Sequence, residues 1–214
     1  MPSQSEVSHR IHRRRRLISG GSALVLGILL GVVITLRGNR ALGVDAEWME
    51  EIVEHRSPVW EVPSFVMNFL GGGFFATVLA VAVTIVFALL KRPWTAVFFA
   101  ITSLISSGLV QLLKALLGRD RPEEIMLSIE SGSFPSGHVA NAATLAALLA
   151  IILWRWWVVA AGAVYVVLMA LSRTYLGAHW VSDTVGGLLI GAGVALIVWA
   201  PFANRMLSER QPTQ

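Results

Sequence analysis

The sequence contains no cysteine among its 214 residues, and charged residues make up only 14% of the chain. The absence of cysteine excludes disulfide bonds, thiolate catalysis and metal sites built from cysteine. The scarcity of charge, together with 55% hydrophobic residues and a mean hydropathy of +0.68, excludes an ordinary soluble domain. We therefore expect a protein that is embedded in a lipid bilayer.

Long apolar stretches predict an all-α fold, a bundle of six transmembrane helices. A helix needs about 20 residues to cross the roughly 30 Å of hydrocarbon in a bilayer. The stretches that approach this length are 17–36, 62–90, 93–113, 131–154, 156–172 and 184–204. The chain then divides into a basic tail (1–16), one membrane domain (17–204) and a short second tail (205–214).

The arginine-rich start of the chain sets the expected orientation, because cytoplasmic flanks carry an excess of Lys and Arg. Residues 10–16 hold five arginines, and six spans return residues 205–214 to the same cytoplasmic side of the plasma membrane. The loops between 37 and 61 and between 114 and 130 are rich in acids and would lie outside the cell. A cleaved signal peptide over residues 1–43 is a disfavoured alternative, since the apolar stretch exceeds a usual signal core.

Two further features of the sequence are the distribution of its basic residues and the pattern of residues 45–56. The net charge is +4, but the basic residues flank the spans and no nucleic-acid motif accompanies them, so we expect no nucleic-acid partner. Residues 45–56 favour a short surface helix with Trp48, Ile52 and Val53 toward lipid and the acids toward water, although a solvated loop is the alternative.

Three polar clusters interrupt the apolar sequence, and the expected topology brings all three to the outer face. Ionisable groups beside membrane-depth helices are costly, so each is a functional hypothesis. Three cations and two histidines with complementary chemistry indicate a bound phosphate. The clusters comprise Lys114 and Arg121; Ser136, Gly137 and His138; and Arg173, His179 and Asp183.

Local patterns predict how these residues are presented. Gly118 should end the helix that carries Lys114, and Ser136 should cap the helix that starts with His138 in its first turn, where backbone N–H groups favour an anion. His179 and Asp183 are four residues apart, so on a helix they would share a face. The carboxylate would then orient the ring, as a histidine nucleophile requires.

Each of these residues also has a purely structural interpretation. Lys114 alone can extend its amine to the membrane interface, and His179 with Asp183 can form a polar clasp between helices. Arg121 and Arg173 can pair with acidic loop residues, namely Glu123, Glu124 and Glu130. The convergence of all five ionisable groups on one leaflet favours a shared site.

The order and spacing of the motifs resemble the signature of the type 2 phosphatidic acid phosphatase superfamily. Lys114 is followed after six residues by Arg121-Pro122, and later by Pro135-Ser136-Gly137-His138. The third motif is Ser172-Arg173 followed by His179 and Asp183. The resemblance covers about residues 60–200, and no position of the signature is substituted.

The resemblance implies a lipid phosphate phosphatase that works through a phosphohistidine. By similarity, His179 attacks phosphorus, Asp183 orients its imidazole, and His138 protonates the leaving oxygen. The residues implied to bind the phosphate are Lys114, Arg121, Ser136, Gly137 and Arg173. No cofactor and no metal are expected, because three cations already neutralise the phosphate charge.

The expected partners are the lipid bilayer and a membrane lipid phosphate. Candidates are a polyprenyl diphosphate such as undecaprenyl diphosphate, phosphatidylglycerophosphate and phosphatidic acid, and an outward site favours the first. The alternatives are a lipid-to-lipid phosphotransferase of the same superfamily, a vanadium haloperoxidase, disfavoured by the six spans, and a lipid transporter or scaffold without turnover. The sequence does not determine which lipid is physiological or the oligomeric state.

Overall fold

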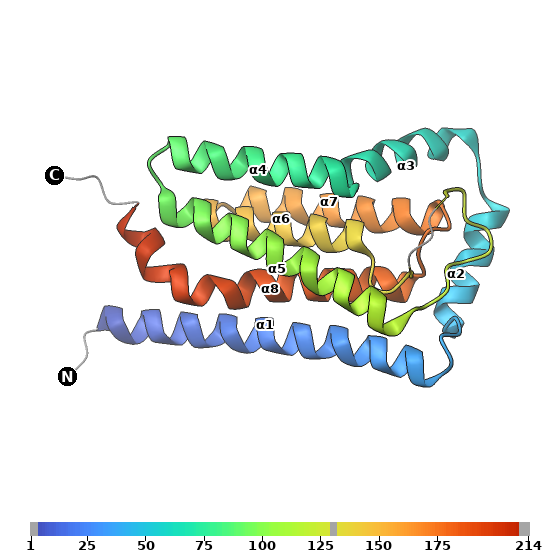
Figure 1. The fold of residues 1–214 in the computed structure, drawn as a ribbon, viewed down its shortest axis with the longest axis horizontal. Coiled ribbons are helices and arrows are strands. Elements are labelled where there is room, and N and C mark those ends of the chain that lie inside the picture. Colours follow the sequence, from blue (N-terminus) through green and yellow to red (C-terminus); the bar gives the residue numbers. More distant parts are fainter. Residues whose placement is uncertain (1–3, 129–131, 210–214) are drawn as a thin grey trace.

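The computed structural model of the protein describes residues 4–128 and 132–209, and in these ranges it contains eight α-helices and no β-strand (Figure 1). The prediction of an all-α fold is therefore confirmed for this part of the chain. The helices are α1 (Gln4–Leu36), α2 (Gly43–Glu54), α3 (Pro58–Gly71), α4 (Gly73–Leu89), α5 (Pro93–Leu117), α6 (Gly137–Leu153), α7 (Trp156–Tyr175) and α8 (Val181–Ser208).

Four of the described helices are long and apolar enough to cross a membrane: α1 over Arg13–Leu36, α5, α7 and α8. Helices α3 and α4 pass the same test together, but they are bent by 52° at the break between them. Helix α6 is apolar but has only 17 residues. Four or five spans therefore follow from length and composition, and the sixth remains a prediction.

Several predicted boundaries differ from the structure. The predicted span 62–90 is divided at Gly72, whose extended backbone (φ −61°, ψ 149°) ends α3 within a run of three glycines that have low helix propensity. The predicted span 131–154 begins outside the described residues, and α6 starts only at Gly137. Helix α1 also begins within the segment predicted as a basic tail, at Gln4.

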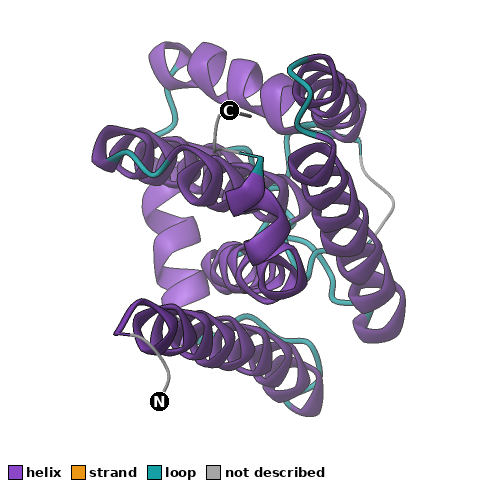
Figure 2. Cartoon of the chain, turned by 90° about the vertical axis from the view of Figure 1, so that its left-hand side faces the viewer, coloured by secondary structure: helices purple, strands orange, loops and turns teal. Residues whose placement is uncertain are grey.

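Helix α8 lies at the centre of the packing, against α1 on one side and α5 and α6 on the other. Figure 2, which looks along the bundle, shows most helices nearly end-on with α1 at its margin. Close contact between α8 and α6 depends on Gly187 and Gly191, where a Cβ atom would come within 2.5 Å of the Ser136 carbonyl oxygen and 2.3 Å of the Ala140 carbonyl oxygen.

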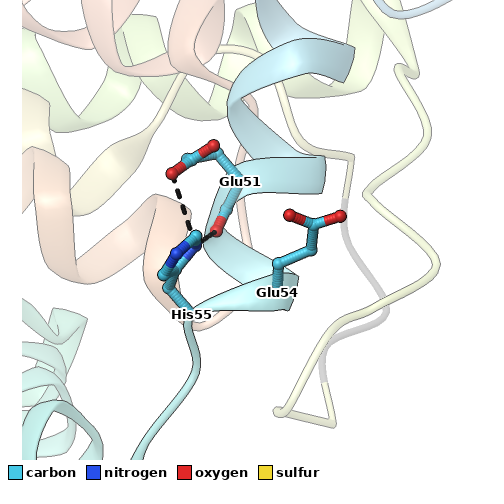
Figure 3. Close-up of side chains that lie close together, drawn as sticks. All are labelled: Glu51, Glu54 and His55. Carbon is cyan, nitrogen blue, oxygen red and sulfur yellow. Dashed lines mark hydrogen bonds and ion pairs between the residues drawn. The ribbon is translucent and has the colours of Figure 1, made fainter.

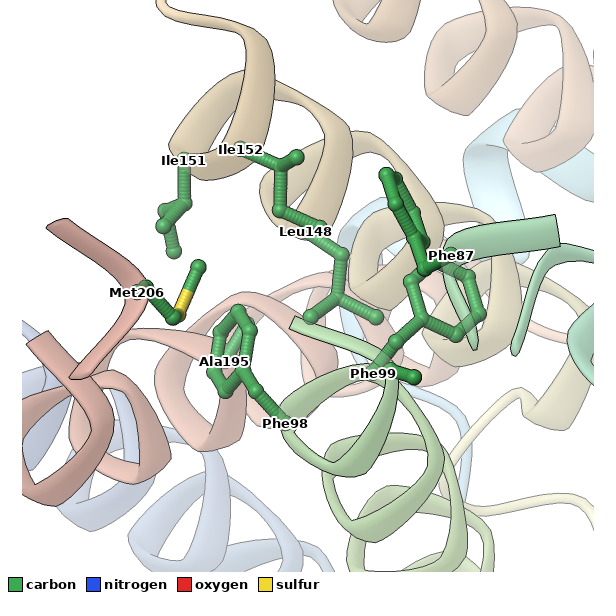
Figure 4. Packing of buried hydrophobic residues seen from close by; sticks show 9 residues of the cluster. Phe87, Phe98, Phe99, Leu148, Ile151, Ile152, Ala195 and Met206 are labelled. Carbon is green, nitrogen blue, oxygen red and sulfur yellow. The ribbon is translucent and has the colours of Figure 1, made fainter. Parts of the chain in front are cut away.

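The end of the bundle where α8 finishes is packed with apolar side chains (Figure 4). In membranes such packing stabilises helix association mainly through dispersion, because the lipid is itself apolar. The buried residues come from α4, α5, α6 and α8, namely Phe87, Ala96, Phe98, Phe99, Leu148, Ile151, Ile152, Ala195 and Met206. Helix α2 lies across the opposite end in Figure 1, where α6 and α8 begin.

Helix α2 confirms the predicted short helix in residues 45–56, but one of its acids does not face water as expected. Asp45 is completely buried. Its carboxylate accepts hydrogen bonds from the backbone N–H of Leu42 at 3.1 Å and from the guanidinium of Arg119 at 2.8 Å. A buried positive charge thus replaces water as the partner of this acid.

Candidate active site

The three polar clusters meet at the end of the bundle where α5 finishes and α6 and α8 begin. Helix α5 ends as predicted, because Gly118 adopts the left-handed conformation (φ 53°) directly after Leu117. Helix α6 starts as predicted, with Ser136 at the N-cap accepting from the backbone N–H of Val139. Two helix ends that are remote in sequence therefore present their polar residues to one region.

The structure places His179 against Asp183, but not on one helix as expected. Helix α8 begins at Val181, so His179 lies in the turn before it. The Asp183 carboxylate reaches back across the helix start, where its Oδ2 accepts from the backbone N–H of Trp180 at 2.9 Å and lies 3.5 Å from Nδ1 of His179. Helix capping, rather than a shared face, brings the pair together.

The other ring nitrogen of His179 faces a guanidinium. Nη1 of Arg121 lies 3.4 Å from Nε2 of His179 and donates to the backbone carbonyl of Ala178. The two ring nitrogens thus have different surroundings, a carboxylate at Nδ1 and a cation at Nε2. An anion held by Arg121 would lie beside Nε2.

Lys114 and Arg121 converge on the same backbone. The ammonium of Lys114 donates to the carbonyls of Gly132 and Ser133, the second at 3.3 Å, and Nη2 of Arg121 donates to the Gly132 carbonyl at 3.3 Å. Two positive side chains thus lie around one carbonyl oxygen. Glu130, considered above as an arginine partner, lies outside the described residues.

Arg173 and His138 share a partner, Asn68 of α3. Arg173 is completely buried and donates to the side-chain oxygen of Asn68, while Nε2 of His138 lies 3.1 Å from the Asn68 backbone oxygen. At the nearby helix break, the backbone N–H of Gly72 bonds to Phe69 O. The second predicted span is therefore broken at Gly72, one turn after Asn68, whose carbonyl oxygen contacts the His138 ring.

Electrostatics link these groups to His179. Burial, and then the positive charges of Arg173, Lys114 and Arg121, lower the pKa of His179 well below its ordinary value. The ring is only 2% exposed. It is therefore neutral at physiological pH, with an unprotonated nitrogen available as a nucleophile.

Ser136 and Gly137 lie at the start of α6 as predicted. Ser136 is buried, and its backbone N–H donates to the Asp183 carbonyl at 2.9 Å, which ties the beginning of α6 to the beginning of α8. Gly137 is the first residue of α6, so its backbone N–H belongs to the first turn, whose donors favour an anion.

The sequence analysis did not identify three residues that contact the site residues or support them, namely Arg119, Asp45 and Asn68. Arg119 lies within the six-residue spacer after Lys114, and Asp45 is one of several acids in a loop, so neither stood out. Asn68 did leave a signal, since it is an amide within the apolar stretch 62–90. A buried amide needs a partner, which could have marked this position.

One other group of ligand-type side chains lies on the surface of α2 (Figure 3). Glu51, Glu54 and His55 place one ligand atom each within 4.8 Å of one another, but all three are exposed. Nδ1 of His55 already lies 3.0 Å from the backbone oxygen of Glu51 and 3.3 Å from its carboxylate. A solvated ion pair explains this geometry without a metal ion.

An apolar groove of about 340 Å³ opens between α2, α3 and α7. It reaches Ser172, the residue before Arg173, and Met67, the residue before Asn68. Its other lining residues are largely apolar, namely Trp48, Ile52, His55, Trp60, Pro63, Ser64, Leu168, Leu171 and Tyr175. The groove thus includes residues that precede Asn68 and Arg173 in the sequence, and its surface suits an alkyl chain.

Curated relatives of the chain include several lipid phosphatases. The chain is 32% identical over 122 residues to the lipid A 1-phosphatase of Rhizobium johnstonii, 31% over 132 residues to phosphatidylglycerophosphatase B of Bacillus subtilis, and 35% over 66 residues to the undecaprenyl-diphosphatase of Sulfolobus acidocaldarius. These matches cover 52%, 57% and 30% of this chain, and 49%, 65% and 31% of the relatives' own lengths.

The fold has a solved counterpart. The transmembrane PAP2-type phosphatidylglycerolphosphate phosphatase of Bacillus subtilis superimposes with a TM-score of 0.74 at 22% identity, over 92% of this chain and 99% of the other. The family model of the PAP2 superfamily matches residues 94–207, which include the three polar motifs and slightly more than half of the chain. This protein therefore belongs to the PAP2 superfamily.

Proposed function

We propose that the protein is a membrane lipid phosphatase that cleaves a phosphomonoester or diphosphate head group through a phosphohistidine at Nε2 of His179. The observation that carries the proposal is the asymmetric surrounding of this ring, with Asp183 at Nδ1 and Arg121 at Nε2. A carboxylate at one nitrogen stabilises the positive charge that develops when the other attacks. Membership of the superfamily supports the same reaction class.

The reaction divides into two steps. Nε2 of His179 forms a bond to phosphorus while the bond from phosphorus to the leaving oxygen breaks, and His138 gives that oxygen a proton. Water then attacks the phosphohistidine, with His138 accepting a proton, which releases inorganic phosphate and restores His179. The lipid alcohol or lipid monophosphate has already left in the first step. The contact of His138 with the Asn68 carbonyl holds its ring before substrate binds.

The positive residues would hold the non-bridging oxygens of the phosphate. Lys114, Arg121 and Arg173 supply three charges, and the backbone at Ser136 and Gly137 supplies helix-start donors. These charges serve the purpose that magnesium serves in other phosphoryl-transfer sites, so the reaction should not require a metal. Lys114 and Arg121 both donate to the carbonyl oxygen of Gly132, so their side chains can reach one oxygen atom together.

The membrane arrangement belongs to the same proposal. Six spans arise if α3 and α4 form one broken span and α6 another, and the site then lies at the outer membrane interface with both ends of the chain in the cytoplasm. The start of α1 and the end of α8 lie together in Figure 1, at the opposite end of the bundle from the site, which supports this arrangement.

The substrate should be amphiphilic. A phosphate head at the cation cluster and an alkyl chain in the adjoining groove fit one molecule. We favour a polyprenyl diphosphate such as undecaprenyl diphosphate, because a site on the outer face matches where such carriers are left after wall synthesis. Phosphatidylglycerophosphate and phosphatidic acid are the other candidates, in keeping with the different head groups named for the relatives.

The test is release of inorganic phosphate by the purified protein in detergent with EDTA present. Polyprenyl diphosphate, phosphatidylglycerophosphate and phosphatidic acid are compared at matched concentrations, and His179→Ala is assayed beside the wild type. We expect turnover by the wild type and none by the variant. Near-normal turnover by His179→Ala would refute the nucleophile, and transfer of label to a second lipid without free phosphate would identify a phosphotransferase.

A further inference from the structure

A buried ion-pair network lies behind the His179–Asp183 pair. The guanidinium of Arg119 contacts two carboxylates at once, Oδ1 of Asp183 at 2.6 Å and Oδ2 of Asp45 at 2.8 Å. All three side chains are completely buried. A buried ion-pair network needs short, well-oriented contacts to each charged group, because these contacts must offset the free energy lost when the charges are removed from water.

Arg119 and the backbone N–H of Trp180 together fix the orientation of the Asp183 carboxylate. Oδ1 accepts from Arg119, and Oδ2 accepts from the Trp180 backbone N–H at 2.9 Å, so each oxygen has a donor from a different direction. The carboxylate cannot rotate without losing one of them. Oδ2 thereby stays on the side of His179, 3.5 Å from Nδ1.

Arg119 is itself held from the far side by α2. Asp45 accepts from Arg119 and also from the backbone N–H of Ser182 at 2.8 Å and the Ser182 hydroxyl at 2.7 Å. Nη1 of Arg119 in turn lies 2.7 Å from that hydroxyl. Helix α2 is thus joined to the start of α8 through Asp45, Arg119 and Ser182.

We propose that Arg119 is a positioning residue for phosphoryl transfer, which holds the Asp183 carboxylate toward His179 and is held in turn by Asp45 of α2. The inference rests on the proposed function, because it assigns Arg119 a purpose only if His179 is the nucleophile. Arg119 acts through Asp183 and not on the substrate. Its loss should therefore slow formation of the phosphohistidine without weakening substrate binding.

The central experiment compares kcat, KM and the single-turnover rate of phosphohistidine formation for Arg119→Gln and Arg119→Lys. We expect Arg119→Gln to lower kcat and the single-turnover rate by about 100-fold, the typical cost of a misplaced reacting group, with KM changed less than about twofold. Arg119→Lys keeps the charge and should recover part of this loss. Arg16→Gln is the matched control, since Arg16 contacts Trp154 and Trp199 instead of the site, and should keep wild-type kcat.

A double variant separates positioning from folding. The trio of Asp45, Arg119 and Asp183 carries a formal net charge of −1, and Asp45→Asn with Arg119→Gln also leaves −1, so the double variant avoids an additional uncompensated charge. We expect it to regain thermal stability relative to Arg119→Gln while kcat stays low. Wild-type kcat in the folded double variant, or a rise in KM at constant kcat, would overturn the role of Arg119.

The same series distinguishes the two proposals. If His179→Ala is inactive while the folded Arg119 variants have wild-type kinetics, only the positioning role fails. If His179→Ala retains turnover, or the wild type releases no phosphate from any lipid tested, the proposed function fails and the role of Arg119 fails with it.

Discussion

Replacing Gly187 with alanine should disturb the site through the backbone, although Gly187 carries no functional group. It lies on α8 against the first turn of α6. A Cβ atom at this position would lie 2.5 Å from the carbonyl oxygen of Ser136, 3.2 Å from the Ala140 nitrogen and 3.3 Å from the Val139 Cβ. Backbone atoms cannot rotate away as a flexible side chain can, so the first turn of α6 must move.

The size of the movement follows from these distances. Ordinary contact begins at 3.4 Å, so the Ser136 carbonyl must retreat by roughly 1 Å. That carbonyl belongs to the turn that presents Gly137 and His138. A misplacement of about 1 Å at a reacting group lowers the rate about 100-fold. Overpacking lowers the free energy of unfolding by about 1–3 kcal/mol, and the higher helix propensity of alanine over glycine offsets roughly 1 kcal/mol of this loss.

The assay measures kcat and thermal stability of Gly187→Ala beside Gly108→Ala. Gly108 lies within α5, and a Cβ atom there would meet nothing within 4 Å. We expect kcat to fall about 100-fold in Gly187→Ala, whereas Gly108→Ala should keep wild-type kcat and gain up to about 1 kcal/mol of stability. Equal behaviour of the two variants would show that the contact between α6 and α8 does not hold the site.

Three further predictions concern single residues. Because the pKa of His179 lies well below 6.5, lowering the pH through 6.5 leaves the ring neutral, so protonation of the nucleophile should not slow single-turnover phosphohistidine formation between about pH 7 and about pH 5.5, and a loss of rate with a midpoint near 6.5 would contradict this assignment. Asn68→Ala removes the side-chain oxygen that accepts a hydrogen bond from the Arg173 guanidinium, so kcat/KM should fall about tenfold or more. Asn68→Asp keeps an acceptor oxygen and should lose less activity; equal losses in the two variants would refute the role of that contact. Leu171→Trp narrows the apolar groove and should raise KM for long-chain lipid phosphates but not for a short-chain analogue, whereas Leu112→Trp on α5, outside the groove, is the control. If Leu171→Trp changes KM equally for the long-chain and short-chain lipids, the alkyl chain does not lie in the groove.

The local patterns of the chain predicted much of the secondary structure and its ends. Gly118 stops α5 because glycine adopts positive φ without strain, and Ser136 caps α6 because its hydroxyl accepts from the first turn. Such devices involve residues within four positions of one another. For this reason they can be read from the sequence without knowledge of the fold.

The relation between His179 and Asp183 was predicted as a pair, but for the wrong local reason. A spacing of four predicts a common helix face, while the chain begins α8 only at Val181 and uses Asp183 to cap the Trp180 N–H. Both arrangements place the carboxylate near the ring. The spacing alone does not determine where a helix begins within a few residues.

The sequence by itself determined the all-α character of the described chain and the residues of the three motifs, since apolar runs, caps and motifs are properties of neighbouring residues. Only the tertiary structure decided that Asp45 is buried against Arg119, that Asn68 contacts both His138 and Arg173, and that an apolar groove forms between α2, α3 and α7. Each of these contacts joins segments tens of residues apart. Their partners depend on which helix ends the packing brings together, and no local propensity specifies that.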